Sequence, residues 1–300
     1  MEYHALSPWD PAKVTLRSRQ LAPGVYAVLP DDAFEKDHVA TTGGLVIGDK
    51  GVLVIESMVS GSLASQLIGE IRKITAKPIR YLINTSYHGD HSYGNFVFPV
   101  NTVVIQHEAT KRYVDQHFEQ DREFMLGLLG RGKGIEEVVP RSADVVMRER
   151  LVIDLGGKQV EIVHFGFAQT PGDIVVWLPQ DKVLWVGNMI QAPPPALPWL
   201  LEGRHKDTIA TLKRLQDFLP AAATIIPGHG KPMTREQISF SVKYLEQLSQ
   251  RVQEAHEEGL TLDETIQRVN LPEYRQYRLF DFAHKQVNVP AVYRDLKQER

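Results

Sequence analysis

Two series of short β-rich runs, each followed by a stretch with helical periodicity, limit the possible folds of this chain more than any other feature. The first series holds "GVYAVL", "GGLVIGD", "GVLVIES", "IRYLINT" and "NTVVIQH". Gly and Asp separate the early runs, as hairpins require. The second series holds "LVIDLGG", "QVEIVHFG", "DIVVWLP", "KVLWVGN" and "ATIIPGHG". Two such halves predict an α/β protein in which two sheets pack face to face with helices outside, an αββα four-layer sandwich.

Apolar residues at three- to four-residue spacing predict amphipathic helices over residues 63–74, 209–218 and 238–255. The last of these begins a helical extension over about residues 235–300. The sequence shows no linker and no low-complexity tract between its two halves. We therefore expect a single domain over residues 1–300, with the helical extension packed on it.

Two stretches lack a regular pattern. Residues 119–135 include "MLGLLGRGKG", and glycines at this density weaken a helix. The proline-rich stretch "QAPPPALPWLLEG" leaves directly from the run "VLWVGN". Either stretch is compatible with a plain surface connection, but the second is also placed to wall a pocket at the end of that strand.

Composition narrows the classes of protein and of site. The chain has 300 residues, 43% of them hydrophobic, and a formal net charge of -3, so it can bury a large core and needs no polyanionic partner. With no cysteine, disulfides and thiolate metal sites are excluded. The sequence contains no signal-peptide pattern and no apolar run of about 18 residues. We expect a cytoplasmic protein that binds neither nucleic acid nor membranes.

The stretch "NTSYHGDHSYGN" follows the apolar run "IRYLI" and gathers possible metal ligands. His88, Asp90 and His91 lie close together there, on a turn that leaves a strand. His229, in "IIPGHGKP", also follows a strand and sits in a glycine-flanked turn. Imidazole and carboxylate groups bind divalent metals of intermediate softness. The pattern favours a metal site, although a purely structural role for these residues stays open.

The order of these motifs resembles the metallo-β-lactamase superfamily over nearly the whole chain. The similarity lies in the early β-rich runs, the "HGDH" turn, "TPGDIVVWLPQDKVLWVGN" and "IIPGHG". The family pattern is His-x-His-x-Asp-His, a later His before "TxGD", an Asp closing "VLFxGD", and a final His in "PGHG". The resemblance implies the αββα fold and hydrolysis by metal-activated water.

The resemblance also assigns the seven ligand positions of a two-metal site, and this chain keeps only some of them. The positions that carry a different residue are Ser86, Gln169 and Asn188, and those that keep the usual residue are His88, Asp90, His91 and His229. The first metal position retains only one ligand and is expected to be empty or very weak. The second retains two histidines and one carboxylate, so one divalent metal is expected, with zinc first and iron or manganese as alternatives.

The resemblance implies catalytic roles for Asp90 and His88. Asp90 would orient or deprotonate the water, and His88, freed from ligation, would act as a general base or as a donor to the oxyanion. Asn188 would supply a weak amide ligand or a hydrogen bond to water. A neutral amide is a weaker ligand than the Asp expected there, so metal affinity should fall.

Other polar residues near the motif have less specific assignments. Ser86 and Gln169 are expected to line a polar pocket. Tyr87 and Tyr93 are candidates for further hydrogen-bond donors or for packing. His164 lies within a strand, five residues before the ligand position, and is not expected to replace the missing ligand.

The leading hypothesis is a hydrolase of a small ester, lactone, thioester or amide that uses a single metal. One alternative is a non-hydrolytic enzyme on the same fold, performing iron and oxygen chemistry or acid/base elimination, cyclisation or isomerisation. Another is a non-catalytic protein that binds a small molecule. A small-molecule ligand is expected in each case, and the helical end leaves a homo-oligomer open.

Overall fold

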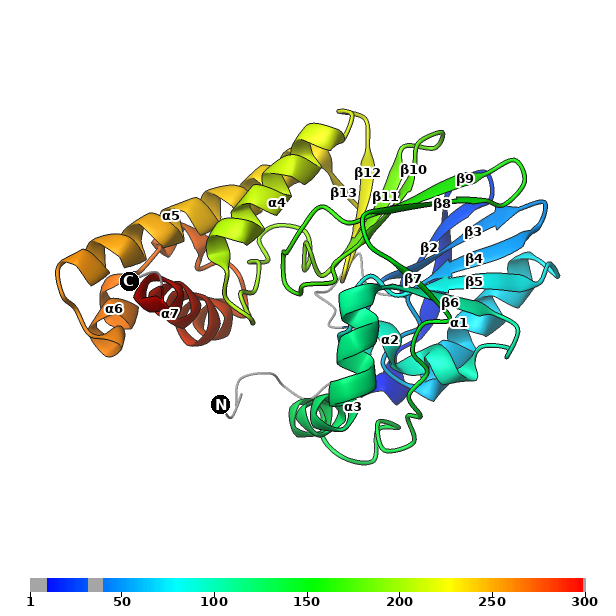
Figure 1. Ribbon diagram of the computed structural model, residues 1–300, viewed down its shortest axis with the longest axis horizontal. Helices are drawn as coiled ribbons and strands as arrows, with labels where there is room; N and C mark the ends of the chain where they lie inside the picture. The colour runs from blue at the N-terminus through cyan, green and yellow to red at the C-terminus, as the bar shows by residue number, and fades with distance from the viewer. Residues whose placement is uncertain (1–9, 32–39, 299–300) are drawn as a thin grey trace.

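The computed structural model of the protein describes residues 10–31 and 40–298, and in this part of the chain two β-sheets pack between outer helices (Figure 1). The first sheet contains seven described strands in the order β1 (Leu16–Ala22), β2 (Val25–Pro30), β3 (Gly43–Gly48), β4 (Gly51–Ile55), β5 (Ile79–Ile83), β6 (Val103–His107) and β7 (Val145–Met147). The second contains six described strands in the order β13 (Met233–Thr234), β12 (Thr224–Pro227), β11 (Val183–Gly187), β10 (Val175–Leu178), β9 (Gln159–Val163) and β8 (Arg150–Asp154).

In each sheet, antiparallel pairing changes to parallel pairing between two strands that a helix connects. Strands β1 to β4 pair antiparallel, whereas β4 pairs parallel with β5 after helix α1 (Gly61–Ile74). In the second sheet, β11 pairs parallel with β12 after helix α4 (His205–Phe218). A parallel pair needs a crossover of this kind because its strands run in the same direction. The carboxyl ends of these parallel strands carry the turns that hold the candidate ligands.

Three hydrophobic clusters correspond to the three interfaces of a four-layer sandwich. The middle cluster joins residues of both sheets, with Trp185 as its largest fully buried side chain. The Trp185 ring occupies the space beside Gly44, where a Cβ atom would lie 2.4 Å from the ring. The second cluster covers the outer face of the first sheet with α1 and α3 (Glu108–Leu129). The third covers the second sheet with α4 and the carboxyl-terminal helices.

The carboxyl-terminal helices extend away from the sheets (Figure 1). They are α5 (Ile238–Glu257), α6 (Leu262–Arg268), a π-helix (Asp281–Asn288) and α7 (Val289–Gln298). Shorter helical turns are α2 (Gly89–Ser92), η1 (Pro11–Lys13), η2 (Tyr93–Val97), η3 (Arg235–Gln237) and η4 (Pro272–Tyr274). Helix α5 begins close to the predicted position, and its apolar face belongs to the same buried cluster as β10 and β11.

The expectation of irregular structure was wrong for residues 119–129, which continue helix α3. Met125, Leu126 and Leu129 are buried against the first sheet's outer cluster, and this packing outweighs the helix-weakening effect of Gly127. The helix ends at Gly130, whose φ of 89° is a conformation that favours glycine. The proline-rich stretch, in contrast, is irregular as expected.

The absence of a signal peptide stays a prediction, since residues 1–9 lie outside the described part of the chain. Across the ranges that the structure describes, none of the helices has both the length and the apolar character needed to cross a membrane.

Replacing Leu248 with Ala is expected to lower the free energy of unfolding by about 2–5 kcal/mol, because the truncation leaves a cavity in a packed core. Leu248 is fully buried within the cluster that joins α5 to the second sheet. Lys243→Ala, on the exposed side of the same helix, is the control and should change stability by less than about 0.5 kcal/mol. Chemical denaturation measures both. Equal effects would contradict the packing described for α5.

Candidate metal centre

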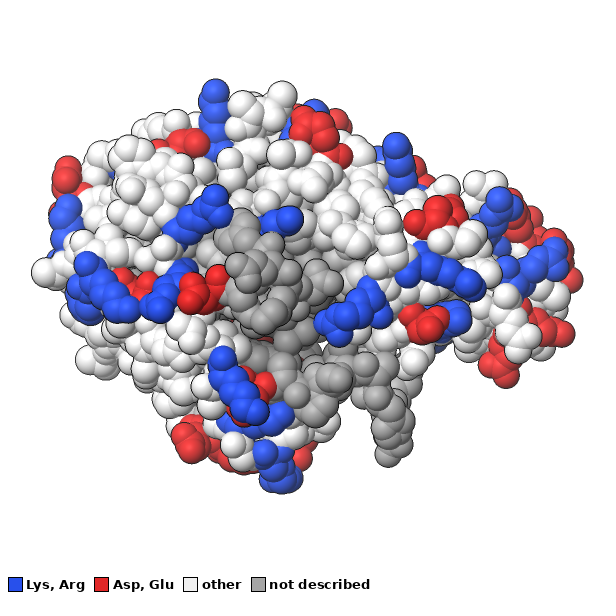
Figure 2. Space-filling view, turned by 180° about the vertical axis from the view of Figure 1, so that it is seen from behind, with Lys and Arg blue, Asp and Glu red and all other residues white. Residues whose placement is uncertain are grey.

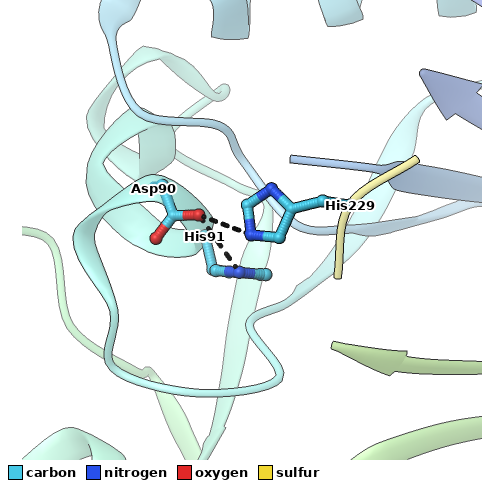
Figure 3. Close-up of side chains that lie close together, drawn as sticks. All are labelled: Asp90, His91 and His229. Atoms are coloured by element: carbon cyan, nitrogen blue, oxygen red, sulfur yellow. Dashed lines mark ion pairs between the residues drawn. The ribbon is translucent and has the colours of Figure 1, made fainter. Parts of the chain in front are cut away.

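Asp90, His91 and His229 converge where the two sheets meet (Figure 3). Asp90 and His91 lie on α2, just after β5 of the first sheet, and His229 lies in the turn after β12 of the second. A β-bridge between Thr41 and His229 joins the two sheets at this point. Asp90 Oδ2 lies 3.3 Å from His91 Nε2 and 3.4 Å from His229 Nε2.

One ligand atom from each of these residues lies within 4.8 Å of the others, so a single cation can contact all three. Burial acts to raise the pKa of Asp90, but His91 and His229 outweigh it and hold this pKa well below its usual value. Burial acts to lower the pKa of His91, but Asp90 and Glu56 outweigh it and raise this pKa. The carboxylates of Asp90 and Glu56 thus favour a positive charge between them. Two imidazoles and one carboxylate fit zinc, iron or manganese.

Glu56 supports His91 from the side opposite Asp90. Its Oε1 atom lies 3.0 Å from His91 Nδ1, and its side chain is only 1% exposed. The Thr85 hydroxyl donates to Glu56 Oε1 at 2.5 Å, and the Thr85 backbone N–H donates to Oε2 at 3.2 Å. A carboxylate on the second nitrogen of a ligating histidine fixes its tautomer and its orientation. The sequence reasoning missed Glu56, although an acidic residue ending the buried run "GVLVIE" was an available signal.

Thr41 fixes Asp90, a role that no sequence pattern indicated. The Thr41 hydroxyl lies 2.8 Å from Asp90 Oδ2 and 2.9 Å from the Asp90 carbonyl oxygen. The Thr42 backbone N–H donates to the carbonyl of Gly228 at 2.8 Å, beside His229. The segment that enters β3 therefore holds both halves of the candidate site.

The three residues that replace the family's ligands hydrogen-bond to protein groups. Asn188 Nδ2 lies 2.9 Å from His88 Nδ1, and Gln169 Nε2 donates to Gln191 Oε1 at 2.8 Å. Ser86, fully buried, accepts the backbone N–H of His88 at 3.4 Å. Sequence reasoning missed Gln191, which belongs to the proline-rich stretch. Its backbone carbonyl also accepts the His229 N–H at 2.8 Å, so this stretch does lie against the site.

The Asn188 contact bears on the two roles predicted for His88. Because the amide Nδ2 can only donate, His88 Nδ1 must accept, and the ring proton then resides on Nε2. Burial is the main cause that lowers the pKa of His88, to about 4, so a neutral ring is favoured. A neutral ring with its proton on Nε2 suits the donor role better than the role of general base.

A model of the metallo-beta-lactamase superfamily matches residues 38–229, which is more than half of the chain. The chain belongs to the metallo-β-lactamase superfamily. This finding confirms the resemblance predicted from the motifs.

Curated relatives from this superfamily are distant. A linear primary-alkylsulfatase from a Pseudomonas species is 22% identical over 271 residues, covering 76% of this chain and 49% of the relative. The chain therefore spans about half the length of that relative. A metallo-beta-lactamase type 2 from Bacteroides fragilis is 21% identical over 204 residues, covering 64% of this chain and 70% of the relative.

Solved structures of superfamily members confirm the αββα fold. A metallo-beta-lactamase from Pontibacter korlensis has a TM-score of 0.61 at 20% identity and covers 77% of this chain and 99% of that one. A stereoselective inverting sec-alkylsulfatase from a Pseudomonas species has a TM-score of 0.72 at 19% identity and covers 93% of this chain and 50% of that one. The larger coverage of this chain shows that the alkylsulfatase likeness extends beyond the part shared with the lactamase.

The superfamily's "TPGD" turn has a structural role here. Asp173 accepts the backbone N–H groups of Gln169 at 2.6 Å and Thr170 at 2.8 Å, which fixes the turn that carries Gln169. His164 Nδ1 lies 2.7 Å from the Asp173 carbonyl oxygen, and its ring stacks on His107 at 4.4 Å. His164 is not in the candidate ligand group found among the described residues.

The two tyrosines beside the motif face other aromatic and acidic groups. Tyr93 donates its hydroxyl to Asp121 Oδ2 at 2.5 Å, so this hydroxyl is engaged within the protein. Tyr87 stacks on Tyr113 with ring centroids 3.6 Å apart. Both arrangements favour the packing role among the two that were predicted for these residues.

Proposed function

We propose that this protein is a hydrolase that holds one divalent cation between Asp90, His91 and His229. The observation that carries the proposal is the position of Asp90 Oδ2, 3.3 and 3.4 Å from the Nε2 atoms of two histidines. A cation bound there would supply the acidity that activates water and the charge that polarises a carbonyl group. Zinc is the first candidate for the ion, with iron and manganese as alternatives.

The protein's own residues orient the reacting groups. The two histidines keep Asp90 ionised, and the Thr41 hydroxyl fixes its position, so Asp90 serves to orient water. Glu56 fixes the His91 ring with Nε2 toward the site. His88, with Nδ1 held by Asn188, directs an Nε2–H donor at negative charge developing on the substrate.

The polar residues that replace the family's ligands support a single ion. The Nδ1 atom of His88 and the amide nitrogen of Gln169 are already hydrogen-bonded to Asn188 and Gln191. Asn188 and Gln169 also supply no anionic charge to balance a second dication. In this proposal the hydroxyl and amide groups at these positions help to orient the substrate.

We propose a small ester, lactone, thioester or amide as substrate. On the face drawn in Figure 2, Lys and Arg side chains alternate with Asp and Glu, and this mixed pattern suits a small molecule better than a nucleic acid. A sulfate ester is the second candidate, favoured by the 93% of this chain that the sec-alkylsulfatase structure covers. We also propose that the protein acts in the cytoplasm.

The test is hydrolysis by protein loaded separately with zinc, iron or manganese. We expect turnover of at least one acyl substrate among a phenyl acetate, a lactone, a thioester and an anilide, and loss of this turnover after metal removal. Turnover of an alkyl sulfate alone would select the second candidate. No turnover of any substrate with any of the three metals would contradict a hydrolase.

A further inference from the structure

A narrow crevice lies beside the candidate metal centre, between α3 and the segment that carries Tyr87. Its interior has room for about one water-sized group. Its wall includes Tyr87, Tyr93, Gln106, Tyr113, Phe118 and Asp121. None of these residues belongs to the candidate ligand group of Asp90, His91 and His229. The crevice therefore needs an explanation of its own.

Asp121 gives the crevice a carboxylate that accepts a hydroxyl group. Its Oδ2 atom accepts the Tyr93 hydroxyl, and among the described residues no Lys, Arg or His forms an ion pair with it. Burial raises the pKa of Asp121 to about 6, the Tyr93 hydrogen bond opposes this rise, and the charge of Asp90 adds to it. A partly buried carboxylate in this position is stabilised by a cation.

Gln106 supplies a second acceptor on the same wall. It is fully buried, its amide nitrogen donates to Asn84 Oδ1 at 2.8 Å, and its Oε1 atom has no hydrogen-bond partner. Leaving a buried acceptor unpaired is unfavourable, so a ligand N–H that donates to it stabilises the complex. An anionic and a neutral acceptor together favour a ligand with positive charge and N–H donors.

Aromatic rings complete the wall. Tyr87 and Tyr113 are stacked 3.6 Å apart, and Tyr93 and Phe118 lie 5.8 Å apart with their planes tilted by 60°. The Arg122 guanidinium lies over the Phe118 ring, 5.7 Å from its centroid. The electron-rich tyrosine rings are the ones that can attract an ammonium group.

Arg141 also borders the crevice, with its guanidinium directed toward backbone carbonyls and not toward Asp121. Its guanidinium donates to four backbone carbonyls, those of Asn95, Phe98, Pro99 and Thr102. Arg141 thus stabilises the turn after η2 and does not neutralise Asp121.

We propose that the crevice binds a small ammonium group, with Asp121 as its counter-ion and Gln106 Oε1 as an acceptor of its N–H. The group belongs either to a free amine or to the amino end of a substrate. The Tyr87 ring meets the His88 ring edge to face at 5.1 Å, so an occupant lies close to the candidate metal centre. Binding of a free amine does not depend on the hydrolytic function proposed above.

The first test is calorimetric titration of the full chain with methylammonium chloride at constant ionic strength, with sodium chloride as the reference. We expect saturable binding that weakens at least tenfold in Asp121→Asn. Asp115→Asn removes an exposed carboxylate from the same helix and should bind as the wild type does. Gln106→Met is a second variant, expected to weaken binding as well, and thermal unfolding checks that each variant is folded.

The second test distinguishes a free amine from the amino end of a substrate. It uses two matched substrates, one with an amino group and one with a neutral group of the same shape in its place. If the group belongs to the substrate, Asp121→Asn raises the KM for the amino substrate only, and methylammonium competes with it. If the ligand is a free amine, methylammonium binds without competing. Two results would overturn the proposal, whether or not the protein hydrolyses any ester. One is the absence of saturable methylammonium binding together with equal KM values for wild type and Asp121→Asn. The other is equal methylammonium binding by wild type and folded Asp121→Asn.

Discussion

Replacing His229 with Ala is expected to abolish stoichiometric metal binding and to lower the rate of hydrolysis by at least about 100-fold. Removing a residue that only supports a metal ligand lowers metal affinity or activity by about 10- to 100-fold, and removing the ligand itself should have a larger effect. His229 supplies one of the two imidazoles and links the second sheet to the site through the β-bridge with Thr41. Elemental analysis and turnover of an acyl substrate measure the two effects.

His164→Ala is the matched control for His229→Ala. This side chain is also a partly buried histidine near a turn, but it contacts His107 and the carbonyl of Asp173. It should keep the metal content of the wild type. Loss of metal in His164→Ala but not in His229→Ala would show that the sequence resemblance assigned the wrong histidine.

Replacing Glu56 is expected to have the largest effect on stability among the residues near the site. Glu56→Ala leaves His91, the Thr85 hydroxyl and the Thr85 N–H without their buried acceptor, and breaking a buried pair in this way costs about 3–5 kcal/mol. Glu56→Gln keeps the shape and one acceptor oxygen, so it should destabilise less but lower metal affinity by about 10- to 100-fold.

Chemical denaturation of metal-free protein and titration with a chelating competitor separate the two consequences of changing Glu56. Glu70→Gln serves as the control, since Glu70 is also buried but pairs with Lys73 and Ser18 on α1 and β1. Its metal affinity should equal that of the wild type. An unchanged affinity in Glu56→Gln would mean that the contact with His91 does not tune the metal.

The sequence predicted those parts of the molecule that arise from local patterns. Strands and crossover helices follow from apolar periodicity, and the candidate ligands Asp90 and His91 adjoin one another in the chain. Residue 229 was found because a glycine-flanked turn after a strand repeats the context of residue 91. The fold and the family were predictable for the same reason, since both depend on the order of such motifs.

The remaining features depend on contacts between distant segments. Glu56 contacts His91, 35 residues later in the sequence, and His88 contacts Asn188, 100 residues later. Local sequence periodicity cannot predict contacts at such separations. The helical conformation of residues 119–129 depends on burial of Met125 and Leu129 against the first sheet, which outweighs the local glycine signal. Sequence reasoning detects a residue's type and neighbours, but such pairings form only when the two sheets close.

The number of metal ions is the central claim, and elemental analysis of wild-type protein purified without added metal or chelator tests it most directly. The arrangement of Asp90, His91 and His229, with hydrogen-bonded amides in place of two of the family's ligands, predicts about one equivalent of a divalent metal per chain. Two equivalents, or none even after incubation with zinc, iron and manganese, would contradict it.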